Sequence, residues 1–125
     1  MKVEGKRRTV LAAVDDMFFW AKIEAVAKGL GVDVVQAANA QILEECLDAS
    51  TPDLILMDLN SKACFPIEAI RRIKGQPSLQ GVPLVAFFSH IQVELEQAAQ
   101  EAGCETIMPR STFTKNLPQI LQNDE

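Results

Sequence analysis

The chain has 125 residues, a hydrophobic fraction of 48% and a formal net charge of −5, which are the size and composition of one globular domain. No apolar stretch approaches the roughly 20 residues of a membrane span, and the apolar run after MKVEGKRR is too short for a signal peptide. The negative charge argues against a nucleic-acid surface. We therefore expect one cytoplasmic domain over residues 1–125, with a core at about 9–122 and an N-terminal arm at 1–8.

Short apolar runs alternate with segments of helical period about five times, which indicates an α/β domain. Strands are expected at 10–14, 32–38, 54–57 and 82–88, with a weaker one at 106–108. These runs lack polar and apolar alternation, as is typical of a parallel sheet covered by helices on both faces. Helices are expected between them, from Asp16 to Gly29 and Gly31, over about 39–47, around 67–73, over about 92–102, and from about 114–117 with Pro118 in the first turn.

The expected helices carry apolar side chains at helical spacing, which predicts their buried faces. The predicted buried positions are Phe19, Ile23, Val26 and Leu30 in the first helix, Ile42, Leu43, Cys46 and Leu47 in the second, Ile67, Ile70 and Ile73 in the third, and Leu95, Ala98, Ala99 and Ala102 in the fourth.

Five such strand–helix units with right-handed crossovers predict an α/β fold of the flavodoxin-like (βα)5 type, a three-layer sandwich. Its parallel five-stranded sheet has the order 2-1-3-4-5. Ligands and chemistry in such sheets gather outside the carboxyl ends of the strands. The residues that follow the first and third strands are therefore the first candidates for a site.

Three acids follow these two neighbouring strands: Asp15 and Asp16 after the first, and Asp58 after the third. Carboxylates crowded into one crevice raise one another's pKa unless a cation joins them, and Mg²⁺ is the cation suited to such oxygens. Simpler roles stay open, because Asp16 is a good N-cap for the first helix and Asp58 could cap the following loop.

Cys46, Cys64 and Cys104 are odd in number and widely spaced, with only His90 to join them in a metal site. They are predicted to be free thiols in a reducing compartment. His90 itself is expected to be a loop or helix-start residue.

Four motifs together resemble the receiver domain of two-component response regulators: VLAAVDD at 10–16, PDLILMDLN at 52–60, VPLVAFFSH at 82–90 and EAGCETIMPRS at 101–111. The resemblance covers about residues 9–122. It implies that Asp58 is the phosphoacceptor position and that Asp15, Asp16 and Asp58 bind Mg²⁺ with the backbone carbonyl of Asn60. It also implies a histidine kinase or another signalling protein as the partner.

Two expected groups of a receiver site are replaced. Phe88 stands where the resemblance requires a Thr or Ser hydroxyl, and phenylalanine has no donor to offer. Ser89 is a substitute hydroxyl only if the strand has already ended, because successive strand side chains point to opposite faces. Arg110 stands in place of the Lys, and its planar fork favours a standing salt bridge to Asp58 or Asp16.

The loop after Asp58 and the fifth strand also depart from the family pattern. Phe65 and Pro66 stand where receivers commonly have an Asp-Gly turn, and Pro66 is expected to start the third helix early. Ile107 replaces the aromatic residue through which receivers transmit phosphorylation. The block Met17 to Trp20 is expected mainly to pack in the core or cover the carboxyl edge.

These departures favour a stand-alone, bacterial receiver-like domain that acts as a protein interaction module, with phosphorylation weak or lost. The resemblance implies docking through the fourth helix, fifth strand and last helix. We expect no enzyme activity beyond self-phosphorylation and self-dephosphorylation at Asp58, no nucleic-acid or membrane partner, and a monomer or weak homodimer. Two alternatives stay open: a working Mg²⁺-dependent phosphoacceptor at Asp58, and a flavodoxin-like small-molecule-binding module, which the acidic loop after the first strand argues against.

Overall fold

Five parallel strands form one sheet in the computed structural model, which describes residues 7–90 and 92–122. The order β2-β1-β3-β4-β5 confirms the predicted topology. Leu11 in β1 lies opposite Val35 in β2 and Ile55 in β3, which sets the register of the central strands. The strands are β1 (Thr9–Ala13), β2 (Asp33–Gln36), β3 (Leu54–Asp58), β4 (Leu84–Phe88) and β5 (Thr106–Pro109).

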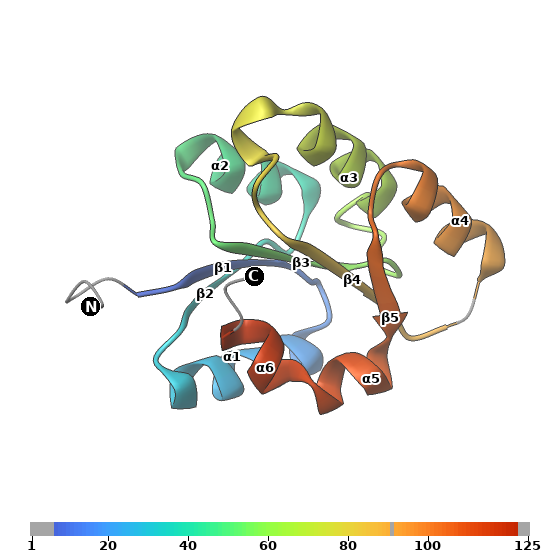
Figure 1. Cartoon of the computed structure of the whole chain (residues 1–125). Coiled ribbons are helices and arrows are strands. Elements are labelled where there is room, and N and C mark those ends of the chain that lie inside the picture. Colours follow the sequence, from blue (N-terminus) through green and yellow to red (C-terminus); the bar gives the residue numbers. More distant parts are fainter. Residues whose placement is uncertain (1–6, 91, 123–125) are drawn as a thin grey trace.

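Helices cover both faces of this sheet, so the three-layer architecture is also as predicted (Figure 1). One layer contains α1 (Met17–Leu30), α5 (Arg110–Lys115) and α6 (Leu117–Gln122). The other contains α2 (Ala40–Ala49), α3 (Pro66–Gly75), the short 3₁₀ helix η1 (Pro77–Leu79) and α4 (Val93–Glu101). No helix in the described part of the chain is long and apolar enough to cross a membrane.

Strand β3 shows why the central strands are apolar throughout. Its side chains alternate between two cores, with Leu54 and Leu56 packing under α1, α5 and α6, and Ile55 and Met57 packing under α2, α3 and α4. All five residues of β3 are buried. The strand therefore delivers its last residue, Asp58, from a fully buried run to the carboxyl edge of the sheet.

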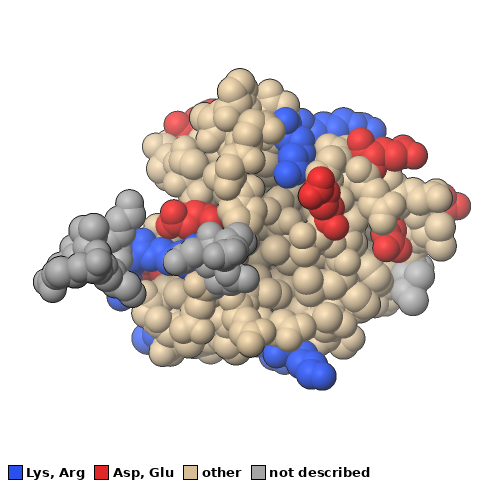
Figure 2. Space-filling model, in the orientation of Figure 1, with Lys and Arg blue, Asp and Glu red and all other residues tan. Residues whose placement is uncertain are grey.

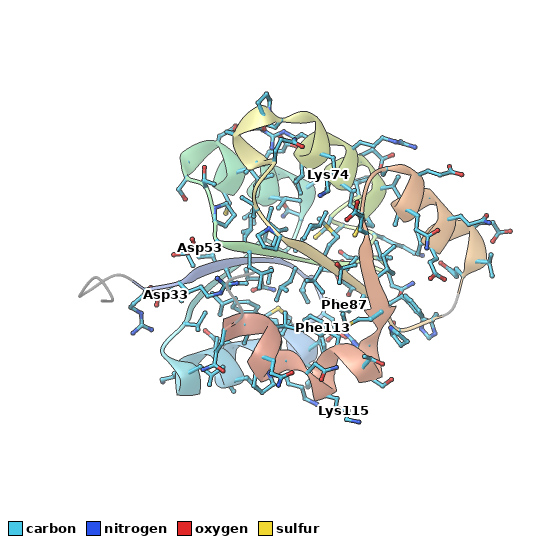
Figure 3. The ribbon with its side chains drawn as sticks, in the orientation of Figure 1. Asp33, Asp53, Lys74, Phe87, Phe113 and Lys115 are labelled. Carbon is cyan, nitrogen blue, oxygen red and sulfur yellow. The ribbon has the colours of Figure 1, made fainter. Side chains whose placement is uncertain are left out.

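The core beneath α1 and α5 contains three contacting aromatic rings. The centroid of Phe87 in β4 lies 4.3 Å from that of Phe113 in α5 and 5.2 Å from that of Phe19 in α1. Figure 3 shows Phe87 and Phe113 between the sheet and this helical layer. These rings join the first and last thirds of the chain directly beneath the carboxyl edge.

The end of the chain differs from the predicted single helix starting at 114–117. Helix α5 begins at Arg110, and the helical backbone breaks at Asn116 before α6 begins. Pro118 has no N–H to donate to the preceding turn, so it is accommodated only near the start of a new helix. The prediction placed Pro118 correctly but missed α5.

Two predictions about burial were wrong in part. Ile42 was expected in the buried stripe of α2 but is 36% exposed, because Leu43 and Leu47 alone supply the buried face of that helix. The edge strands β2 and β5 contain no fully buried residue, and Val35 on β2 is exposed. Continuous burial thus belongs to the central strands, since an edge strand has a neighbour on one side only.

Candidate functional site

The three acids lie at the carboxyl edge of neighbouring strands. Asp15 and Asp16 follow β1, Asp58 ends β3, and Ala13 in β1 lies opposite Met57 in β3. Each of the three carboxylates makes a different set of contacts, and these contacts determine what the edge can do.

Asp16 caps the first helix. Its Oδ1 accepts hydrogen bonds from the backbone N–H groups of Phe18 at 3.0 Å and Phe19 at 3.1 Å, which confirms the N-cap role. Its Oδ2 accepts a hydrogen bond from Arg110 Nη2 at 3.2 Å. The Phe19 amide and the Arg110 guanidinium together hold the pKa of Asp16 below the usual value.

Asp15 turns toward the loop after β3. Its Oδ2 accepts a hydrogen bond from Ser61 Oγ at 2.8 Å and a longer one from the Ala63 N–H at 3.4 Å. Ser61 is buried, and its Oγ also accepts a hydrogen bond from the Cys64 N–H at 3.3 Å. Asp15 therefore ties the end of β1 to the loop that leads into α3.

Asp58 is buried, with only 5% of its surface exposed. Its Oδ1 accepts a hydrogen bond from the Asn60 N–H at 2.9 Å, so it caps the turn that follows β3. Burial raises the pKa of Asp58, the Asn60 bond and the charge of Arg110 lower it, and the charges of Asp15 and Asp16 raise it further. Burial is the largest of these effects, so the pKa of Asp58 lies above the ordinary value.

Arg110 points toward α1, at the opposite end of the sequence. Its Cζ lies 3.9 Å from the centroid of the Phe19 ring, a cation–π contact that adds to the ion pair with Asp16. The Nε of Arg110 is buried without a hydrogen-bond partner among the described residues. Of the two predicted salt bridges, the structure forms the one with Asp16, and Arg110 influences Asp58 only through its charge.

Ser89 and Asn60 link the loops after β3 and β4. Strand β4 ends at Phe88, and the Ser89 N–H and Oγ donate to Asn60 Oδ1 at 2.7 Å and 3.2 Å. The His90 N–H donates to the same oxygen at 3.3 Å. Ser89 thus lies outside the strand, as a substitute for the missing hydroxyl must. Its hydroxyl, however, is hydrogen-bonded to Asn60.

The predicted cation site is not assembled by the side chains as they lie. No group of three His, Cys, Asp or Glu side chains within residues 7–90 and 92–122 could hold a metal ion. Asp15 is hydrogen-bonded to Ser61, and Asp16 is paired with Arg110. Because the guanidinium occupies the position of a counter-ion to Asp16, the residues do not fit a metal in this arrangement.

Solved structures with the same arrangement of elements identify the fold. The chemotaxis response regulator CheY4 of Vibrio cholerae matches with a TM-score of 0.81 over 96% of this chain and 100% of that one, at 18% sequence identity. This chain has the receiver-domain fold. Phosphorylated RcpA, a cyanobacterial phytochrome response regulator, matches with a TM-score of 0.77 and 21% identity over 94% of this chain and 90% of that chain.

The Mn²⁺-bound form of the response regulator Rcp1 matches with a TM-score of 0.79 and 18% identity, over 93% of this chain and 96% of that one. A protein with the receiver fold thus binds a divalent cation. No protein-family model and no curated protein matches the sequence. The likeness concerns the fold, and the roles of individual side chains rest on the contacts described above.

Two side chains that differ from the receiver pattern pack against the core between the sheet and helices α3 and α4. Phe88 and Ile107 are both partly buried against this cluster, which also contains Ala86 and Ala99. Neither side chain carries a hydrogen-bonding group. Phe88, where the receiver resemblance implies a hydroxyl, therefore supplies an apolar group to this core instead.

The loop into α3 is partly apolar and runs directly into a proline. Pro66 is the first residue of α3, as predicted, and Phe65 before it has a φ of 49°. A non-glycine residue in this left-handed region is uncommon. The Phe65 side chain is exposed beside the carboxyl edge.

The block after the acid pair divides between core and surface. Phe19 is buried and Trp20 is partly buried, while Met17 and Phe18 are exposed, with Phe18 at 91%. The expected core packing therefore applies to half of the block only.

Two functional contacts were missed by the sequence interpretation. Ser61 binds Asp15, and the Asn60 side chain, rather than its backbone carbonyl alone, joins two loops. The signal for both was the polar pair that directly follows Asp58 and Leu59 in a loop. Short polar side chains in such loops commonly satisfy backbone groups that have left the sheet.

Proposed function

We propose that this receiver-fold domain is an interaction module of two-component signalling in which phosphorylation of Asp58 is weak or lost. The observation that carries the proposal is the ion pair between Arg110 and Asp16 at 3.2 Å. This pair joins the residue in the Lys position to an acid of the expected cation site. Both groups are thereby engaged with each other instead of with a phosphoryl group and a metal.

The surroundings of Asp58 support the same proposal. Asp58 is buried, so only a small part of its surface is open to a phosphodonor. Transfer also needs donors and cations aimed at the phosphoryl oxygens. Phe88 offers no donor, and the Ser89 hydroxyl is engaged with Asn60.

Exposed apolar side chains around the carboxyl edge support a protein partner. Met17 and Phe18 begin α1, Phe65 precedes α3 and Val93 begins α4, and all four are exposed. Each lies at the start of a helix, so they surround the edge where the acids lie. Exposed apolar groups that gather in this way are typical of interaction surfaces.

The test is exposure of the purified chain to acetyl phosphate with Mg²⁺, followed by intact mass, and to beryllofluoride with Mg²⁺, followed by amide NMR. We expect no covalent adduct and no change of the amide spectrum beyond that seen in Asp58→Ala. A stable adduct that disappears in Asp58→Ala would establish the working phosphoacceptor instead. A receiver domain that labels under the same conditions serves as the positive control.

A further inference from the structure

A hollow lies at the opposite edge of the sheet from the three acids, where β3, β4 and β5 begin. Its volume is about 450 Å³, within the range of roughly 300 to 1,000 Å³ that is usual for small-molecule sites. The residues that line it are Leu54, Lys74, Gln80, Gly81, Val82, Pro83, Leu84, Val85, Glu105, Thr106, Met108 and Ile120. None of them belongs to the acid edge, which is the carboxyl end of the sheet where Asp15, Asp16 and Asp58 lie.

The lining combines an apolar wall with two opposite charges. Val82 and Leu84 are buried, and Met108 and Ile120 are partly buried against the core beneath α1 and α5. The charged groups of the lining are the ammonium of Lys74 and the carboxylate of Glu105. Figure 2 shows basic and acidic side chains close together in the upper part of the face that Figure 1 presents.

Lys74 is held in place along its aliphatic stem. A Cβ placed on Gly103 would lie 2.9 Å from Lys74 Cγ, so the stem packs directly against the glycine backbone. Gly103 has a φ of +113°, which side-chain-bearing residues rarely adopt. Figure 3 shows Lys74 beside the first residues of β5. This contact restricts the aliphatic stem of Lys74 before any ligand arrives, which lowers part of the entropic cost of binding.

The two charged residues line one hollow without pairing with each other. Neither the Lys74 ammonium nor the Glu105 carboxylate takes part in an ion pair or a side-chain hydrogen bond within the described residues. Both nevertheless act on the buried thiol of Cys104. Burial is the main cause that raises the pKa of this thiol, while the charge of Lys74 lowers it and that of Glu105 raises it.

We propose that this hollow binds a small zwitterion, an α-amino acid with an apolar side chain. Its carboxylate would pair with Lys74, its ammonium with Glu105, and its side chain would contact Val82 and Met108. A simple anion could pair only with Lys74, a simple cation only with Glu105, and an apolar molecule with neither charge. A ligand with both charges at one end and an apolar group at the other satisfies the whole lining.

The experiment compares three related compounds by amide NMR of the full chain. They are L-leucine, 4-methylpentanoate, which lacks the amine, and 3-methylbutylamine, which lacks the carboxylate. We expect saturable shifts at Gly81 and Thr106 with L-leucine, and binding at least about tenfold tighter than for either fragment. Fragments that bind as tightly as L-leucine, or an absence of saturable shifts with L-leucine, would overturn the proposal.

Charge-removing variants locate the site. Lys74→Gln keeps most of the aliphatic stem, and Glu105→Gln keeps the shape of the side chain, so each removes one charge with little change in packing. Each is expected to weaken L-leucine binding about tenfold or more. Lys28→Gln and Glu24→Gln on the exposed face of α1 are the matched controls and should bind as the parent does.

The amide spectrum of each variant reports whether it is folded. If Lys74→Gln loses the native spectrum, Glu105→Gln at the exposed start of β5 supplies the decisive comparison. Equal affinity for L-leucine in a folded charge variant and the parent would also overturn the assignment. The site is independent of the acid edge, so Asp58→Ala is expected to bind L-leucine normally, whatever the outcome at Asp58.

Discussion

Arg110 and Asp16 join the two ends of the sequence across the carboxyl edge of the sheet. Arg110 Nη2 lies 3.2 Å from Asp16 Oδ2, and the guanidinium stacks 3.9 Å from the Phe19 ring centroid. The same Asp16 caps α1, so one carboxylate serves a helix end and an ion pair. Substitutions of Asp16 therefore test the stability of the helix cap, and substitutions of Arg110 test cation binding at the acid edge.

Asp16→Ala is expected to lower the free energy of unfolding by about 1 kcal/mol at neutral pH, mainly through the lost helix cap. The pair with Arg110 adds little, because both side chains are partly exposed. The pKa of Asp16 is lowered in the folded state. The stability that Asp16 contributes is thus present above its ordinary pKa of 3.8. It is lost as the pH falls through the lower pKa of the folded state.

Urea unfolding of the parent and Asp16→Ala, at neutral pH and below that lowered pKa, measures this effect. Asp16→Asn is the control, because an amide oxygen can still cap the helix without carrying a charge. Equal stability of Asp16→Ala and the parent at neutral pH would contradict the capping role.

Asp58→Asn is expected to stabilise the domain at neutral pH, on the order of 1 kcal/mol. The pKa of Asp58 is raised, so its contribution to stability is fully present below the unfolded value of 3.8 and is lost as the pH rises through the folded pKa. The amide oxygen that Asp58→Asn introduces can still accept the hydrogen bond from the Asn60 N–H. The stability difference should shrink in acid, as chemical unfolding at several pH values will show.

The double substitution Phe88→Thr with Arg110→Lys is expected to increase labelling of Asp58 by acetyl phosphate. It supplies a hydroxyl donor at the end of β4 and replaces a planar guanidinium with a compact ammonium. Intact mass in the presence of Mg²⁺ measures the labelled fraction. The same pair of substitutions combined with Asp58→Ala is the control and should remain unlabelled. Labelling of the parent to the same extent would show that neither group limits transfer.

Arg110→Ala is expected to strengthen Mg²⁺ binding at the acid edge about tenfold or more. Removing the guanidinium frees Asp16 Oδ2 and takes away a positive charge that competes with the metal. Amide NMR during Mg²⁺ titration measures the affinity. Arg72→Ala removes an arginine that pairs with Glu44 and Asp48 and serves as the control. Unchanged affinity in Arg110→Ala would mean that Arg110 does not compete for the acids.

Phe113→Ala is expected to cost about 3–5 kcal/mol of unfolding free energy, the range for removing a fully buried ring. Phe113 stacks on Phe87 at 4.3 Å and contacts Phe19 at 5.8 Å. Phe18→Ala is the matched control, because Phe18 is 91% exposed and should change stability by less than about 0.5 kcal/mol. Chemical denaturation compares the two variants. A loss of similar size in both would contradict the assignment of Phe113 to the core.

Much of the fold could be predicted because local patterns and the parallel sheet agree. The run Leu54 to Met57 is apolar at every position, and the structure buries each of its side chains in one of two cores. Gly31 at a φ of 72° ends α1, as the glycines predicted. Helix α5 escaped prediction, because the segment RSTFTK has no long apolar stripe and only Phe113 is buried.

The sequence by itself determined the order of the strands, the edge at which Asp15, Asp16 and Asp58 gather, and the absence of a hydroxyl at Phe88. The strand order follows from right-handed crossovers and the usual topology of five strand–helix units, and the other two follow from apolar patterning and side-chain chemistry. Only the tertiary structure decided that Arg110 pairs with Asp16, that Ser61 binds Asp15, and that Lys74 and Glu105 face one hollow. The reason is physical: such pairings depend on distances between segments far apart in the chain, and packing sets those distances.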